Sequence, residues 1–136
     1  MSAAERHRDL VTGNREMDEE HALQLRLLRE LVDNLESGDA PAAFEVFDRL
    51  EAFTIAHFLA EELLMRLHAY PALEAHAADH AGFLGELKGV RARLAGGLDE
   101  AAREDADAFA RRLLAHIASA DHAFADFQRA GGASAA

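Results

Sequence analysis

Apolar residues recur at helical spacing along four segments of this chain, and short turn sequences separate the segments. These turns lie at residues 37–41, 70–71 and 96–97, and each contains glycine, proline or both. Gly38 suits the left-handed end of a helix, and Pro71 pushes the residue before it out of helical geometry. Four helices joined by short turns predict an all-α fold, an antiparallel up-down-up-down four-helix bundle.

The 136 residues are expected to form a single domain. Residues 1–16 lack helical periodicity and are predicted to form an N-terminal arm, with turn-forming residues at positions 12–14. The helical repeat begins at about Met17, so the bundle should occupy about 17–130. A glycine pair at 131–132 should end the fourth helix and leave a short tail.

The composition narrows the possible functions. The net charge is −11, which argues against binding to nucleic acid or to anionic membrane surfaces. The chain has no cysteine, so a metal would need nitrogen and oxygen ligands. No apolar run has transmembrane length and no signal peptide is evident, so we expect a cytoplasmic protein. A strongly acidic surface, with no second apolar stripe found on any helix, predicts a monomer.

Five of the eight histidines fall on the predicted interior faces of the helices. They are His21, His57, His76, His80 and His116. His57 and Glu61 are four residues apart on the second helix, which places both on one face. His76 and His80 repeat this spacing on the third helix.

A single histidine on an apolar face is more often an ordinary buried residue than a metal ligand. Five imidazoles in one core without a metal would leave many polar nitrogens unpaired, at roughly 1–3 kcal/mol each. An unpaired carboxylate such as Glu61 is also rarely buried. We therefore expect a metal centre in which Glu61 bridges two cations. Glu62 is five residues after His57, so it is expected to be a boundary or surface carboxylate.

With these residues in view, the chain resembles the hemerythrin family over about residues 17–124. The motifs that carry the resemblance are Asp18-Glu19-Glu20-His21, His57-Phe58-Leu59-Ala60-Glu61-Glu62, Tyr70-Pro71 followed by His76 and His80, and His116-Ile117 with Asp121. The resemblance implies a bundle that holds two non-haem irons joined by an oxo or hydroxo bridge. It assigns His76, His80 and His116 to one iron, His21 and His57 to the other, and Glu61 and Asp121 to both.

The resemblance also implies that dioxygen binds end-on, as a hydroperoxide, at the iron with two histidines and leaves unchanged. Five neutral imidazoles replace most of the carboxylates of di-iron oxidases, so a mild ferrous/ferric cycle is expected. We therefore expect an O₂-binding protein for storage, delivery or sensing, and not primarily a catalyst. The alternatives are a di-iron enzyme acting on peroxide, nitric oxide or ferrous iron, and a signalling module.

Four further residues are expected beside the bound gas: Phe58, Leu113, Ile117 and Gln24. The first three match positions that line the gas pocket in the family, and packing in the core is their alternative role. Gln24 stands where oxygen carriers of the family generally have an aliphatic residue. Its amide is expected to contact a helix interface or an imidazole; alternatively it reaches dioxygen and speeds autoxidation.

His116 and Asp121 are five residues apart, a spacing that does not suit a regular α-helix. Five residues turn two side chains about 140° apart. An i→i+5 turn would bring them together, and such turns occur mostly at functional sites. We therefore predict a π-type bulge or a comparable distortion between Ala115 and His122.

Overall fold

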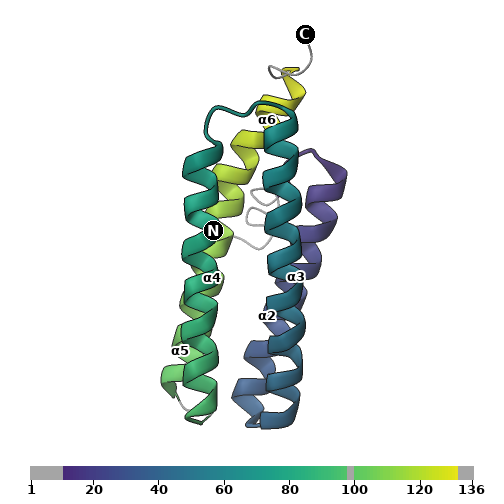
Figure 1. The fold of residues 1–136 in the computed structure, drawn as a ribbon. Helices are drawn as coiled ribbons and strands as arrows, with labels where there is room; N and C mark the ends of the chain where they lie inside the picture. Colours follow the sequence, from purple (N-terminus) through teal and green to yellow (C-terminus); the bar gives the residue numbers. More distant parts are fainter. Residues whose placement is uncertain (1–10, 98–99, 132–136) are drawn as a thin grey trace.

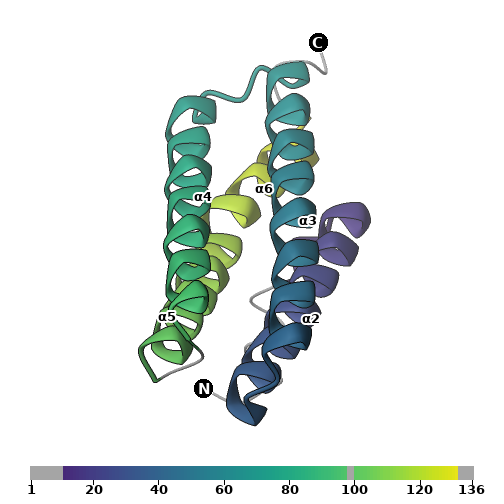
Figure 2. The same ribbon diagram turned by 60° about the horizontal axis from the view of Figure 1, so that its bottom comes forward.

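Four helical segments pack side by side in the computed structural model, which describes residues 11–97 and 100–131 (Figure 1). They are α2 (Arg15–Ser37), α3 (Ala40–Leu67), α4 (Leu73–Ala95) and a fourth segment made of α5 (Glu100–His116), η1 (Ile117–Asp121) and α6 (His122–Arg129). α2 and α4 each pack against both α3 and α5. The predicted antiparallel four-helix bundle is confirmed (Figure 2).

The ends of α2 and the start of α3 lie close to their predicted positions, whereas α3 ends at Leu67, three residues before the predicted break at residues 70–71. Asn14 caps α2, and its side chain accepts a hydrogen bond from the backbone N–H of Met17. The helix therefore starts at Arg15, two residues before the predicted start. Gly38 ends α2 with a left-handed φ of 76°, and Asp39 caps α3. Most of the predicted arm and the tail after residue 131 lie outside the described residues.

Two apolar clusters fill the bundle at different levels, and a polar layer separates them. The smaller cluster contains Met17, Met65, Phe124 and Ala125, and the larger one extends over all four helical segments. On α2, His21 lies between Met17 of the smaller cluster and Leu27 of the larger. The other predicted ligands belong to the same layer. Within the described part of the chain, no helix has both the length and the apolar character needed to cross a membrane.

α3 carries a second apolar stripe, so the expectation that no helix has one was wrong. Ile55, Leu59, Leu63 and Leu67 follow one another at intervals of four residues, and they are 41%, 62%, 54% and 64% exposed. Each step of four residues advances about 40° around a helix. The row therefore lies on the outer side of α3, although the sequence merges it with the broad stripe that faces the core.

Candidate metal centre

Seven buried polar side chains meet in the layer between the two apolar clusters. They are His21 from α2, His57 and Glu61 from α3, His76 and His80 from α4, His116 from α5 and Asp121 from η1. Each is at most 6% exposed. The structure thus brings together all the residues that the sequence predicted as metal ligands.

Glu61 lies at the centre of this layer and contacts imidazoles on two sides. Its Oε1 atom lies 3.1 Å from Nε2 of His80 and 3.4 Å from Nε2 of His76. Its Oε2 atom lies 3.1 Å from Nε2 of His57 and 3.4 Å from Nε2 of His21. Each oxygen of one carboxylate therefore serves a different group of histidines.

Asp121 repeats this arrangement. Its Oδ1 atom lies 2.9 Å from Nε2 of His76 and 3.1 Å from Nε2 of His116, and its Oδ2 atom lies 3.0 Å from Nε2 of His21. Two subsites follow from these contacts. The three-histidine subsite comprises His76, His80 and His116, the two-histidine subsite comprises His21 and His57, and both share the two carboxylates.

The ligand atoms in this layer are not satisfied by hydrogen bonds. Among the residues that the structure describes, no hydrogen-bond partner is found for Nε2 of His21, His57 or His80, for either oxygen of Glu61, or for Oδ1 of Asp121. A buried polar atom without a partner costs about 1–3 kcal/mol. In each subsite the candidate ligand atoms all lie within 4.8 Å of one another. Nitrogen and oxygen atoms in this arrangement fit two metal ions.

Protons take the place of metal charge when no cation is bound. Burial disfavours a charged imidazole, but the carboxylates of Asp121 and Glu61 in contact with it outweigh this effect and raise the pKa of His21 and of His76 to about 9. Burial also opposes ionisation of Glu61, yet the four imidazoles around its carboxylate lower its pKa. Metal ions that bind here must therefore displace protons from the histidines.

The predicted π-type bulge is confirmed. η1, from Ile117 to Asp121, is a π-helical turn inserted between α5 and α6. The wider turn gives five residues nearly the angular advance that four residues have in an α-helix. His116 and Asp121 therefore point to the same layer, and their side chains lie 3.1 Å apart.

Deleting Ala118 should consequently leave the metal centre in place. The deletion would convert η1 into a regular α-helix in which His116 and Asp121 are four residues apart, like His57 and Glu61. Ala118 is exposed, so no core contact is lost. Inserting one more alanine after it should rotate Asp121 out of the layer and abolish metal binding. Metal content per folded chain, with helicity followed by circular dichroism, distinguishes the two variants; loss of metal in the deletion variant would contradict this explanation.

Comparison with known proteins assigns the chain to a family. The family model described as the hemerythrin HHE cation binding domain matches residues 12–127. The chain belongs to the hemerythrin family. The resemblance inferred from the sequence is thereby confirmed.

Several relatives in the hemerythrin family align over most of the chain. The bacteriohemerythrin of Stenotrophomonas maltophilia (strain R551-3) is 31% identical over 118 residues, which cover 87% of this chain and 76% of the relative. The bacteriohemerythrin of Pseudomonas aeruginosa (strain LESB58) is 29% identical over 121 residues, which cover 89% of this chain and 78% of the relative. A myohemerythrin of Theromyzon tessulatum is 33% identical over 76 residues, which cover 56% of this chain and 58% of the relative.

Three carboxylates outside the hemerythrin ligand layer contact the outer nitrogens of its histidines. The contacts to Nδ1 are Glu20 Oε1 to His57 at 3.0 Å, Glu62 Oε2 to His80 at 3.0 Å, and Asp79 Oδ2 to His116 at 3.5 Å. Such acceptors fix the orientation of a ligating imidazole and increase its basicity. Glu62 lies at the boundary, as expected, but it also contacts the predicted ligand His80.

The sequence analysis missed this role for the three carboxylates, although a signal was present. Each one is adjacent in sequence to a predicted ligand on its own helix. One residue advances about 100° around a helix, so the carboxylate turns away from its neighbour toward the imidazole of the next helix. An acidic residue beside a ligand is therefore the pattern to search for.

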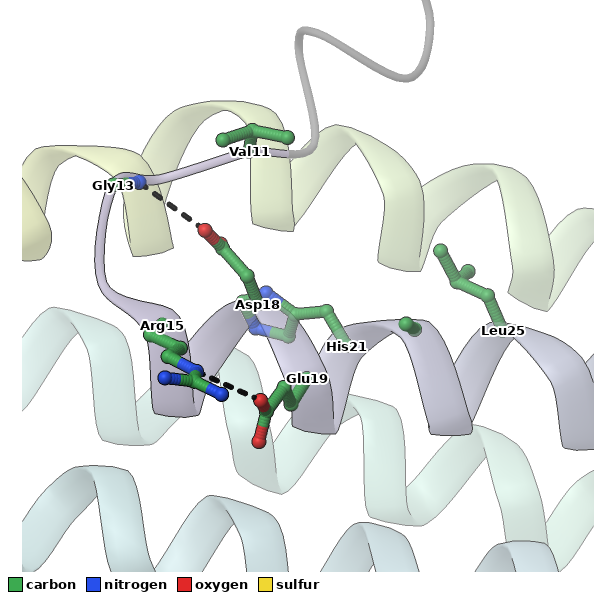
Figure 3. Close-up of a pocket in the computed structure, with 8 residues that line it drawn as sticks. Val11, Gly13, Arg15, Asp18, Glu19, His21 and Leu25 are labelled. Carbon is green, nitrogen blue, oxygen red and sulfur yellow. Dashed lines mark hydrogen bonds and ion pairs between the residues drawn. The ribbon is translucent and has the colours of Figure 1, made fainter.

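His21 differs from these histidines at its outer nitrogen. Within the described residues, its buried Nδ1 atom has no hydrogen-bond partner. His21 instead lines a pocket of about 480 Å³ beneath Val11 and Gly13 (Figure 3). Asp18 holds this part of the arm, accepting hydrogen bonds from the backbone N–H groups of Thr12 and Gly13 at 2.8 and 3.3 Å. The outer carboxylates therefore support histidines of α3, α4 and α5, whereas His21 on α2 lies beside a pocket instead.

Replacing Glu62 with glutamine should weaken metal binding at the three-histidine subsite by about 10–100-fold. The amide removes the charged acceptor from Nδ1 of His80 while leaving all seven ligands in place. A chelator competition titration measures the change. Glu45→Gln, at an exposed position of the same helix, is the matched control and should bind metal like the wild type. Equal affinity in both variants would show that the contact with Glu62 does not support the ligand.

The residues expected beside the gas differ in what surrounds them. The ring of Phe58 stacks on that of His80, with centroids 3.8 Å apart and an interplanar angle of 3°, and lies 6.0 Å from that of His57. Leu113 and Ile117 are fully buried in the larger apolar cluster. Phe58 is thus placed beside histidines of both subsites, and all three residues also pack in the core.

Gln24 connects two helices. Its Nε2 atom donates a hydrogen bond to Oγ1 of Thr54 on α3 at 3.0 Å, and both residues are fully buried. This contact supports the helix-interface role. Its Oε1 atom has no partner among the described residues, so the amide is only half satisfied.

Proposed function

We propose that this protein binds dioxygen at two non-haem irons joined by an oxo or hydroxo bridge. One observation carries the proposal. Glu61 and Asp121 each direct one oxygen to each of two histidine groups, an arrangement in which a carboxylate bridges two metal ions. The iron pair would supply the electrons that reversible binding of dioxygen needs. Membership in the hemerythrin family supports the choice of iron.

We place dioxygen at the two-histidine subsite. This subsite has one imidazole fewer than its neighbour, which leaves room for an external ligand. In the proposed site, Phe58, Leu113 and Ile117 keep water from the bound gas through their buried apolar side chains. A dry pocket disfavours protonation and loss of the bound oxygen. Storage, delivery or sensing of oxygen in the cytoplasm is the role that we infer.

Elemental analysis tests the metal assignment. We expect two irons per chain, one for each group of ligands. Zinc or manganese at the same stoichiometry would retain the metal centre but overturn the proposed function. A purified protein that holds no metal in stoichiometric amount would overturn both.

The contact between Gln24 and Thr54 provides a further prediction. Gln24→Leu should cost about 1–3 kcal/mol of stability, because the hydroxyl of Thr54 loses its buried partner. Adding Thr54→Val should restore most of this loss, since both polar groups are then gone. Chemical unfolding of the single and double variants measures the effect. An equal loss of stability in the single and the double variant would contradict the role of Gln24 at the interface between α2 and α3.

The same variant tests whether Gln24 affects bound dioxygen. If the amide retains water near the gas, Gln24→Leu should slow autoxidation, measured as decay of the oxygenated visible spectrum at fixed pH. Unchanged or faster decay would leave Gln24 with its structural role alone.

A further inference from the structure

The outer face of α3 is almost free of charge in a strongly acidic protein. The exposed residues from position 52 to position 67 are Ala52, Ile55, Ala56, Leu59, Ala60, Leu63, Arg66 and Leu67. Arg66 is the only charged residue among them, although charged residues make up 29% of the chain and the net charge is −11. A contiguous apolar face of this kind marks an interaction site more often than chance exposure.

The side chains on this face form a ridge beside a groove. Ile55, Leu59, Leu63 and Leu67 stand in one row at intervals of four residues. The exposed alanines at positions 52, 56 and 60 form the adjacent row at the same interval. When two helices pack, rows of this kind from one helix fit between the rows of the other. A face that carries both a ridge and a shallow groove is complementary to itself.

We propose that this face binds a second copy of the chain, with the two α3 helices antiparallel about a two-fold axis. The ridge is centred on position 61. In an antiparallel pair centred there, Leu59 of one copy faces Leu63 of the other, and Ile55 faces Leu67. The contact is centred on Leu59 and Leu63, because the row turns by about 120° around the helix between Ile55 and Leu67. A two-fold dimer is the commonest form of homo-oligomer.

Charge favours the antiparallel arrangement and a protein partner. Arg66 of one copy lies opposite Ala56 of the other, about ten residues or ~15 Å along the axis from the second Arg66. A parallel pair would place the two guanidinium groups side by side. A membrane surface is disfavoured because helices that lie on membranes flank their apolar face with lysine and arginine. Here the half-buried Glu51 and Glu62 border one side of the face, and the nearby Arg91 is paired with Glu51 and Asp48.

The size of the face sets the expected affinity. The ridge runs over thirteen residues of helix, about 18 Å, so the interface belongs to the small class of protein contacts. We expect a dimer with a dissociation constant of roughly micromolar order. The proposed dimer differs from the monomer expected from the sequence, an expectation that relied on a strongly acidic surface and on the absence of a second apolar stripe.

Analytical ultracentrifugation over a wide range of protein concentrations tests the proposal. The wild type should pass from monomer to dimer, and Leu59→Lys should remain monomeric throughout. The side chain of Leu59 is already 62% exposed, so helicity and metal content should not change. Leu23→Lys is the matched control: Leu23 is 38% exposed on α2, outside the ridge, and this variant should still dimerise. A monomeric wild type, a dimer that survives Leu59→Lys, or loss of the dimer in Leu23→Lys would each overturn the proposal.

Disulfide formation between introduced cysteines tests the register, because the natural chain contains no cysteine. A mixture of the Leu59→Cys and Leu63→Cys variants should form cross-linked heterodimers faster than either variant forms homodimers. Equal rates would overturn the antiparallel register. None of these measurements depends on iron, so they stand apart from the proposed oxygen-binding function.

Discussion

Replacing Glu61 with alanine should reduce the metal content from two ions per chain to less than one. Each oxygen of this carboxylate serves a different subsite, at 3.1 Å from His80 on one side and 3.1 Å from His57 on the other. One substitution therefore removes a ligand from both metals. The loss should also destabilise the metal-free fold by about 3–5 kcal/mol, because protonated imidazoles lose their buried counter-charge.

Two variants separate loss of metal from loss of fold. Glu61→Gln retains the shape of the side chain but not its charge, so it should fold and still fail to hold both ions. Glu45→Ala removes an exposed glutamate from the same helix, and a surface ion pair contributes at most about 1 kcal/mol. Metal content and unfolding curves are measured on all three variants. Two metals per chain in folded Glu61→Gln protein would exclude Glu61 as the bridging ligand.

Removing the metal ions should lower the melting temperature by about 10 °C or more at neutral pH. A ligand present at a thousand times its dissociation constant stabilises a fold by about 4 kcal/mol, and the proposed centre has two metal sites. One kcal/mol corresponds to roughly 2–8 °C in domains of this size class. Differential scanning calorimetry of the metal-loaded and metal-free protein measures the difference.

The difference in melting temperature between the metal-loaded and the metal-free protein should widen as the pH rises. In the metal-free protein the pKa of His21 and of His76 is raised to about 9 from an ordinary value of 6.5. A raised pKa stabilises the fold fully below the unfolded value of 6.5, and this stabilisation is lost as the pH rises through about 9. The metal-loaded protein already has unprotonated imidazoles, so it does not lose this contribution. If this difference in melting temperature stayed constant or narrowed between pH 6.5 and 9, protons would not replace the metal charge in the polar layer of the metal-free protein.

The sequence predicted much of the fold because the local signals agree with the tertiary structure. Gly38, Asp39 and Pro71 each mark a turn by a backbone or capping preference that the bundle does not override. The histidines were recognisable because a spacing of four defines one helix face. The irregular spacing of His116 and Asp121 was itself informative, since a π-type turn brings both to one layer.

Other features depend on how the helices lie relative to one another. Glu20 contacts an imidazole of α3, and Glu62 contacts one of α4, so neither contact follows from spacing within a helix. The hydrogen bond between Gln24 and Thr54 likewise depends on the level at which α2 and α3 meet. The exposed ridge on α3 was missed because the helix is apolar almost all round, and only packing separates its inner face from its outer face.

The visible spectrum of the iron-loaded protein during a cycle of oxygenation tests the central claim most directly. The protein is reduced without air, oxygen is admitted, and the oxygen is then removed under inert gas. We predict an oxygen-to-iron charge-transfer band that persists in air, disappears when the oxygen is removed and returns when it is readmitted. Rapid collapse to the spectrum of an oxo-bridged ferric pair, or no band at all with two irons bound, would contradict reversible oxygen binding.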